Sequence, residues 1–155
     1  MTTPIGDIPA SSIPAARAWI LAGLQAQYPD SSGVLVCLDE PSTDEPDSII
    51  SVGDVHQTYS PEQDVGSGGA GWLREDYTIT VTVDCVRGGD DAAGVFAAAR
   101  QFADMVVAVV RSDPSLGGAV DRARPGSVTH TGGWTDDHMG RQSVIDIGID
   151  CLKIL

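Results

Sequence analysis

Residues 74–112 constrain the fold more than any other part of the chain, because a strand pattern runs directly into a helix pattern. Between Tyr77 and Cys85 the odd-numbered residues are apolar and the even-numbered ones are Thr or Asp. Side chains alternate between the two faces of a strand, so this pattern predicts a half-buried strand with one polar face. Beyond a glycine-containing turn, apolar residues at helical spacing predict a long helix that ends at Asp113-Pro114. The fold must therefore pack an amphipathic helix against an alternating strand.

The remaining elements are predicted from shorter patterns. Residues 13–28 form an amphipathic helix with Ser12 as its N-cap, since Ser favours that position. Apolar or alternating runs predict four further strands, at residues 33–38, 48–52, 126–131 and 142–155. The first two of these runs are expected to form a hairpin. The predicted fold class is α+β: a single, mostly antiparallel sheet of about four or five strands, with two helices packed on one face.

Two segments lack periodicity and are predicted to lie outside the regular elements. Residues 1–11 contain two prolines and are expected to form a flexible N-terminal arm. Residues 12–155 are expected to form a single domain. Residues 53–71 include a glycine-rich run and are predicted to be a long loop that becomes ordered on a partner. The loop lacks the Gly-Lys-Ser/Thr ending of a phosphate-binding loop, and it leads into a strand.

The charge of the chain excludes some classes of function. The net charge is −13, and no Lys or Arg occurs between Arg17 and Arg74. This balance argues against a protein that binds nucleic acid or an anionic membrane over its surface, because both need basic residues. The acidic stretch is interpreted as a solvated surface, or alternatively as one that repels DNA or meets a basic partner. No apolar stretch approaches the roughly 20 residues of a membrane helix, and no signal-peptide pattern opens the chain, which predicts folding in a cytoplasm.

A search for catalytic or metal-binding chemistry finds weak candidates. The three cysteines are widely spaced and are predicted to be small buried hydrophobic residues rather than a disulfide or zinc site. Asp136, Asp137 and His138 are adjacent in a predicted turn, with His130 across the hairpin, and we interpret them as solvated turn residues. His56 has no nucleophile that the sequence identifies. No catalytic motif is present, and we expect no cofactor.

The polar face of the sheet is the most distinctive candidate surface. A wetted sheet face explains it, but it would also suit the wall of an aqueous channel built by a ring of subunits. The residues assigned to this lumen face are Thr78, Thr80, Thr82, Asp84, Asp146 and Asp150. A second set is assigned to a subunit or tube interface: Trp72, Arg100, Asp104, Arg111 and Trp134.

The order of elements resembles the tail-terminator (tail-completion) proteins of long-tailed bacteriophages. The resemblance covers most of the chain from about Ile13. It consists of the opening helix, the strand that begins Arg74-Glu75-Asp76-Tyr77, the helix at residues 92–111, the connection Ser112-Asp113-Pro114-Ser115-Leu116-Gly117-Gly118, and the closing strand at residues 145–155.

The resemblance implies a structural virion protein and no catalytic residues. Its subunits would form a hexameric ring that caps the tail tube, ends tube polymerisation and offers a joining surface to the head-side connector protein. DNA would pass through the lumen without specific binding, and the protein would be assembled in the host cytoplasm. We hypothesise that Asp84, Asp146 and Asp150 line the lumen and keep DNA from adhering. The alternatives are a small α+β enzyme or ligand-binding domain, with residues 134–138 and His56 at its site, and another neck or head–tail connector protein.

Overall fold

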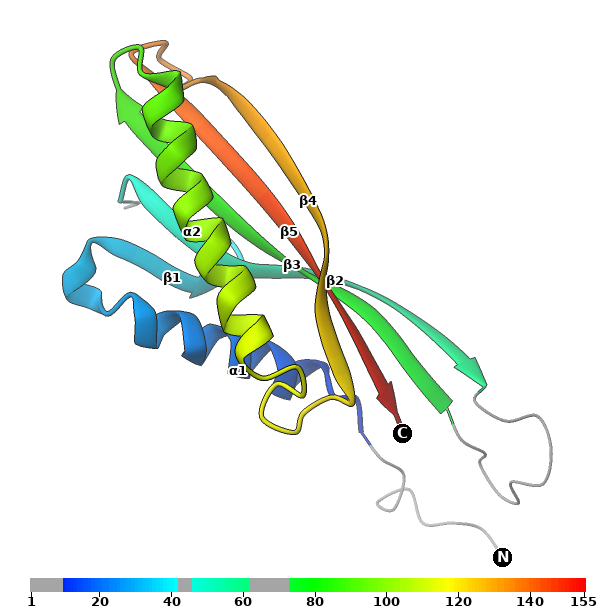
Figure 1. Ribbon diagram of the computed structural model, residues 1–155. Coiled ribbons are helices and arrows are strands. Elements are labelled where there is room, and N and C mark those ends of the chain that lie inside the picture. The colour runs from blue at the N-terminus through cyan, green and yellow to red at the C-terminus, as the bar shows by residue number, and fades with distance from the viewer. Residues whose placement is uncertain (1–9, 42–45, 62–72) are drawn as a thin grey trace, which may run out of the picture.

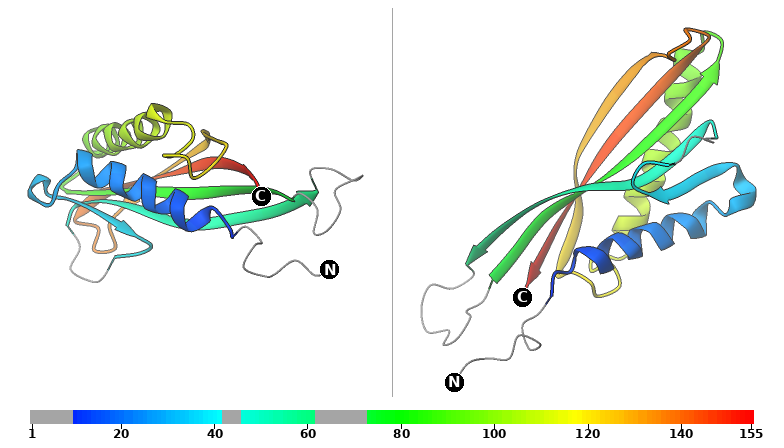
Figure 2. Two further views of the ribbon diagram at one scale, coloured as in Figure 1. Left: turned by 90° about the horizontal axis from the view of Figure 1, so that it is seen from below. Right: turned by 180° about the vertical axis from the view of Figure 1, so that it is seen from behind.

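A computed structural model describes residues 10–41, 46–61 and 73–155 of the protein. Its elements are α1 (Ile13–Gln27), the short 3₁₀ helix η2 (Asp30–Ser32), β1 (Val34–Leu38), β2 (Ser48–Pro61), β3 (Leu73–Gly88), α2 (Ala92–Ser112), β4 (Arg122–Trp134) and β5 (Gly140–Ile154). The strands form one sheet in the order β1-β2-β3-β5-β4. Both helices lie on the same face of this strongly twisted sheet (Figures 1 and 2). The predicted fold class is therefore confirmed.

The pairing of β1 with β2 differs from the expected hairpin. The two strands are parallel, with Val34 opposite Ser48 and Leu38 opposite Val52. All other neighbouring strands are antiparallel. Nine residues separate β1 from β2, enough for the chain to return to the start of β1 and run in the same direction. The sequence prediction failed because two short apolar runs joined by a polar segment do not specify direction.

The segment predicted as a loop from residue 53 is instead a strand as far as Pro61. The register of β2 against β3 shifts between Val52 and Val55, where Gly53 and Asp54 form an irregularity. This extra length breaks the alternation of apolar residues, so the strand resembled a turn in the sequence. Residues 62–71 and Trp72 lie outside the described residues, as do residues 1–9 of the expected arm. Ser11, the last residue of that arm, donates a hydrogen bond to Glu75.

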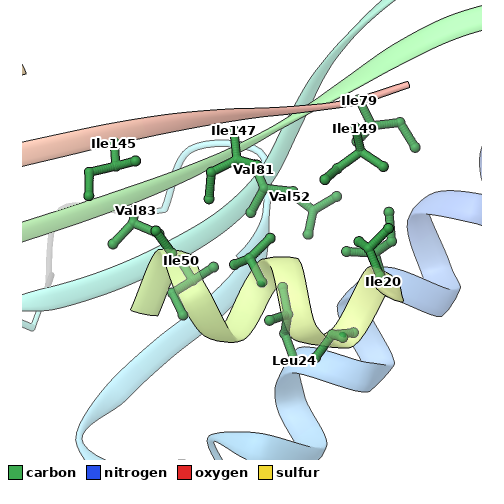
Figure 3. Packing of buried hydrophobic residues seen from close by; sticks show 14 of the residues in the cluster. Ile20, Leu24, Ile50, Val52, Ile79, Val81, Val83, Ile145, Ile147 and Ile149 are labelled. Atoms are coloured by element: carbon green, nitrogen blue, oxygen red, sulfur yellow. The ribbon is translucent and has the colours of Figure 1, made fainter. Parts of the chain in front are cut away.

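The core lies between the two helices and the inner face of the sheet. α1 contributes Ala16, Ile20 and Leu24, one turn apart, which pack against sheet residues beside α2 (Figure 3). The buried stripe of α2 follows the predicted helical spacing. Its members are Val95, Ala99, Ala103, Val106, Val109 and Val110. Phe96 of the same helix is 44% exposed, since it lies beside His130 of the edge strand β4.

The helices approach each other closely where α1 carries a glycine. A Cβ on Gly23 would lie 2.8 Å from Val109 Cγ1, so a larger residue at this position would push the helices apart. By length and composition α2 also qualifies as a membrane-crossing helix, contrary to the expectation from the sequence. In the fold, its apolar stripe packs on the sheet.

Two of the three cysteines are buried as predicted. Cys85 and Cys151 face the core, and burial raises the pKa of both thiols, that of Cys151 to about 12. Cys37 departs from the prediction, since it is only partly buried. Its strand β1 lies at the edge of the sheet.

Candidate functional site

The polar face of the sheet, on the side away from both helices, is the candidate functional site. β3 and β5 form its centre, and their antiparallel register sets Thr78 opposite Asp150 and Thr82 opposite Asp146. All six residues assigned to this face from the sequence lie on it, because each has the same parity along its strand. The assignment of this face to a lumen stays a prediction.

Hydrogen bonds hold the carboxylates of this face against the sheet. Thr78 Oγ1 donates to Asp150 Oδ1 at 2.8 Å, and Thr82 Oγ1 donates to Asp146 Oδ1 at 2.7 Å. Asp84 accepts from the Gln142 amide at 2.9 Å. Each acid therefore bonds to a side chain on the neighbouring strand, directly opposite for Asp146 and Asp150 and diagonal for Asp84, and the acids do not converge on a common point. Such a row is suited to presenting fixed negative charge to water or a partner.

One end of the polar face is acidic. A hollow of about 480 Å³ there is lined by Asp39, Glu40, Asp54 and Asp84, together with hydroxyl groups of neighbouring residues. One of its acids is paired: Arg17 Nη2 lies 2.8 Å from Asp39 Oδ1. The acidic stretch noticed in the sequence thus reaches the polar face itself.

The other end of the polar face holds arginines that sequence reasoning missed. A pocket of about 270 Å³ is lined by Arg74, Arg122 and Arg124, with His56, Thr58 and Asp150 among its other residues. Arg74 Nε donates to both carboxylate oxygens of Asp76, at 3.0 and 3.2 Å. The guanidinium groups of Arg122 and Arg124 make no hydrogen bond or ion pair with the described part of the chain, although both residues lie in the β4–β5 ladder. Their alternate spacing is typical of a strand, but the sequence analysis predicts a strand only from residue 126, whereas β4 begins at Arg122.

The residues assigned to an interface do not form one cluster. Arg100 forms an ion pair with Asp104 at 3.0 Å and contacts His130 Nε2 at 3.3 Å. Arg111 is 11 residues further along α2, or roughly 16 Å at 1.5 Å per residue. Trp134 lies at the end of β4 under Arg141, whose guanidinium carbon is 3.6 Å from the ring centroid. The interface roles of these residues stay predictions.

The turn residues considered for metal or acid–base chemistry are occupied by local hydrogen bonds. The hydroxyl of Thr135 and the backbone N–H of Met139 both donate to Asp137, and these bonds lower the pKa of its carboxyl group. His130 contacts α2 rather than the His138 turn. Among residues 10–41, 46–61 and 73–155, no group of three or more potential ligands could hold a metal ion.

A buried carboxylate that the sequence analysis did not single out lies on the opposite, helix-facing side of β3. Glu75 is fully buried and accepts four hydrogen bonds: from Ser11 Oγ, from Gln57 Nε2, and from the backbone N–H and hydroxyl of Ser12. Burial alone raises its pKa, but the hydrogen bonds from Ser11, Ser12 and Gln57 outweigh burial and leave the pKa lowered. Ser12 is thus the predicted N-cap residue, yet its side chain donates to Glu75 rather than capping α1 itself. The cluster anchors the start of α1 to the sheet.

Both lateral edges of the sheet have unpaired backbone. β4 is the last strand on one side and pairs only with β5 among the described strands. On the other side β1 covers only residues 48–52 of β2, so β2 from Val55 onward pairs only with β3 in the described part of the chain. Large apolar side chains are exposed near both edges: Val128, Trp134 and Phe96 on the β4 side, Leu38 and Tyr59 on the other.

No protein-family model matches this sequence, and a search of curated proteins finds no significant match.

Proposed function

We propose that the protein is a structural subunit of a phage tail, a tail terminator whose copies join into a ring, most simply a hexamer, on the end of the tail tube. The ring would stop growth of the tube and offer a joining surface to the head-side connector protein. In this proposal the polar face lines the passage for DNA, and the protein needs neither catalysis nor a cofactor. The resemblance in element order supports the choice of family.

The observation that supports self-association is the pair of unpaired sheet edges. An exposed, long edge strand tends to pair with another strand. β4 has no Lys, Glu or Asp from Pro125 to Trp134, so it lacks the charges that usually discourage such pairing.

The direction of the strands favours pairing between the two different edges. β2 and β4 run in opposite directions, since three antiparallel steps separate them in the sheet. The β4 of one copy beside the β2 of the next would therefore extend the sheet with the same antiparallel pattern. A head-to-tail contact of this kind generates a ring when its rotation closes. Pairing of β4 with a second β4 would give only a dimer and would leave Tyr59, 58% exposed, uncovered.

The mass of the protein in solution and on purified tail tubes tests the ring. We expect a multiple of the subunit mass, and we expect Thr131→Lys on the free edge of β4 to reduce association because a lysine on an edge strand opposes pairing. Gln25→Lys on the exposed side of α1 adds the same charge away from the edges and serves as the control. A strict monomer both alone and with tubes would refute the ring.

The terminator role needs a separate experiment in the parent phage. Deleting the gene is expected to yield tails of uncontrolled length. Tails of normal length that fail to join heads would instead indicate another neck protein.

A further inference from the structure

We propose that the pocket formed by Arg74, Arg122 and Arg124, at one end of the polar face, binds a phosphate group. In the ring proposed above, this group would belong to the DNA backbone; free inorganic phosphate is the other source of the same chemistry. The inference rests on the proposed function only for the source of the phosphate.

Positive charge is concentrated in this pocket. The chain has 9 Lys and Arg against 22 Asp and Glu, yet three arginines line a single pocket. Two carboxylates, Asp76 and Asp150, also line it, and each has a partner, Arg74 and Thr78 respectively. The pocket is thus a locally cationic place on a strongly anionic protein.

Most N–H donors of the three guanidinium groups remain available to a ligand. Arg74 bonds Asp76 through Nε, so its two terminal nitrogens have no hydrogen-bond partner in the described part of the chain. The guanidinium groups of Arg122 and Arg124 have no such partner there. Guanidinium groups bind phosphate oxygens through paired N–H donors, and several of them around one space suit a group with multiple oxygens.

The pocket is a small hollow that suits a single phosphate group. The volume of about 270 Å³ is below the roughly 300–1,000 Å³ of pockets that enclose small-molecule ligands. The lining residues come from β2, β3, β4 and β5, so the pocket is a hollow across the width of the sheet. A phosphate group of a longer chain can enter such a hollow while the rest of the chain continues along the face.

The acidic remainder of the face limits the affinity. Asp146, Asp84 and Asp54 lie further along the same face and repel a polyanion. The predicted interaction is therefore weak, independent of base sequence and steeply dependent on salt. It corresponds to one local contact on a face that otherwise discourages adhesion.

The test compares Arg124→Gln with Arg87→Gln. Both remove one positive charge, but Arg87 lies at the opposite end of β3 from Arg74, outside the pocket, where it pairs with Asp91. Binding of a labelled DNA duplex at low salt is measured by fluorescence anisotropy, and binding of inorganic phosphate by calorimetry. We expect Arg124→Gln to weaken DNA binding about tenfold and to reduce the slope of log K against log salt by about 0.9, with little change for Arg87→Gln.

Each alternative outcome has a definite meaning. Equal losses in the two variants, or no binding of DNA or phosphate by the wild type, would overturn the pocket. Binding of inorganic phosphate without DNA would support the pocket and assign it to the free anion. A change in subunit association without any effect on phosphate would overturn it in favour of carboxylates from a second copy.

Sedimentation of the same samples separates this proposal from the proposed function. A monomer that binds phosphate through Arg124 would support the pocket and refute the ring. A ring that does not bind phosphate would support the ring and refute the pocket.

Discussion

Glu75 offers the sharpest test of the fold, because this fully buried carboxylate has no cationic partner among the described residues and depends on hydrogen bonds. Its oxygens accept from Ser11 Oγ, Ser12 Oγ and Gln57 Nε2 at 2.6 Å, and from the Ser12 backbone N–H at 3.0 Å. The last of these is at the N-terminus of α1, where a negative charge also interacts favourably with the helix dipole. The change to test is Glu75→Gln, with Glu75→Ala as the harsher variant.

The expected magnitudes follow from the partners that lose their acceptor. Glu75→Ala leaves the buried Ser12 N–H unsatisfied, and we expect a loss of about 3–5 kcal/mol in the free energy of unfolding. Glu75→Gln keeps an oxygen for Ser12 but turns an NH₂ group toward Ser11 and Gln57, whose side chains can reorient. We expect a loss of about 1–2 kcal/mol, or a Tm lower by roughly 2–8 °C for a chain of this length.

The pH dependence distinguishes a charged network from simple packing. The pKa of Glu75 is lowered from 4.5 in the folded protein, so its stabilisation is present above pH 4.5 and is lost as the pH falls through the folded pKa. The difference between wild type and Glu75→Gln, measured by urea unfolding, should therefore be full at pH 7 and shrink toward pH 3. Comparing the two proteins at each pH removes the contribution of the other carboxylates. A difference that is absent at pH 7, or unchanged down to pH 3, would refute the reasoning.

Three further predictions concern other parts of the fold. In thermal melts, Gly140→Ala should destabilise the protein by about 1–3 kcal/mol, because the added Cβ would lie 2.5 Å from the backbone oxygen of Arg87. Gly133→Ala, with open space around the added Cβ, should have a much smaller effect and serves as the control. Thiol labelling at pH 8 should modify Cys37 well before Cys85 and Cys151, whose pKa values are raised by burial, and fast labelling of all three in the native state would contradict the packing. Thr82→Val should lower the free energy of unfolding, measured by urea unfolding, by about 1 kcal/mol because it removes the hydrogen-bond donor to Asp146. Thr80→Val, opposite Gly148, serves as the control because no side-chain hydrogen bond is lost there.

The sequence predicted the centre of the fold well because its signals there are local. The alternation from Tyr77 to Cys85 determines which side chains face the helices, and the spacing of Val95, Ala99 and Val106 determines the buried stripe of α2. The same parity rule located the six polar-face residues correctly, since Thr78 and Asp150 point to one side whatever the strand order.

What sequence reasoning missed depends on contacts between distant residues or on irregular backbone. The direction of β1 relative to β2 follows from how the chain returns, which short apolar runs do not encode. The irregularities at Gly53 and Gly126 interrupt the alternation, so most of β2 and the start of β4 resembled loops. The partners of Glu75 are 18 to 64 residues away in the chain, and its charge suggested a solvated position.

In a ring of identical copies, the basic and acidic ends of the polar face would form two separate circles of charge. Rotation about the ring axis moves every residue to the same height in each copy, so the residues at one end of the face form one circle and those at the other end a second. The arginine pocket would then give a basic circle, and Asp54 and Asp84 an acidic one. A polyanion moving along the axis would meet attraction at one level and repulsion at the other. The hypothesis that Asp84, Asp146 and Asp150 keep DNA from adhering stays a prediction, and in such a ring we expect the basic circle to attract the DNA backbone at a different level.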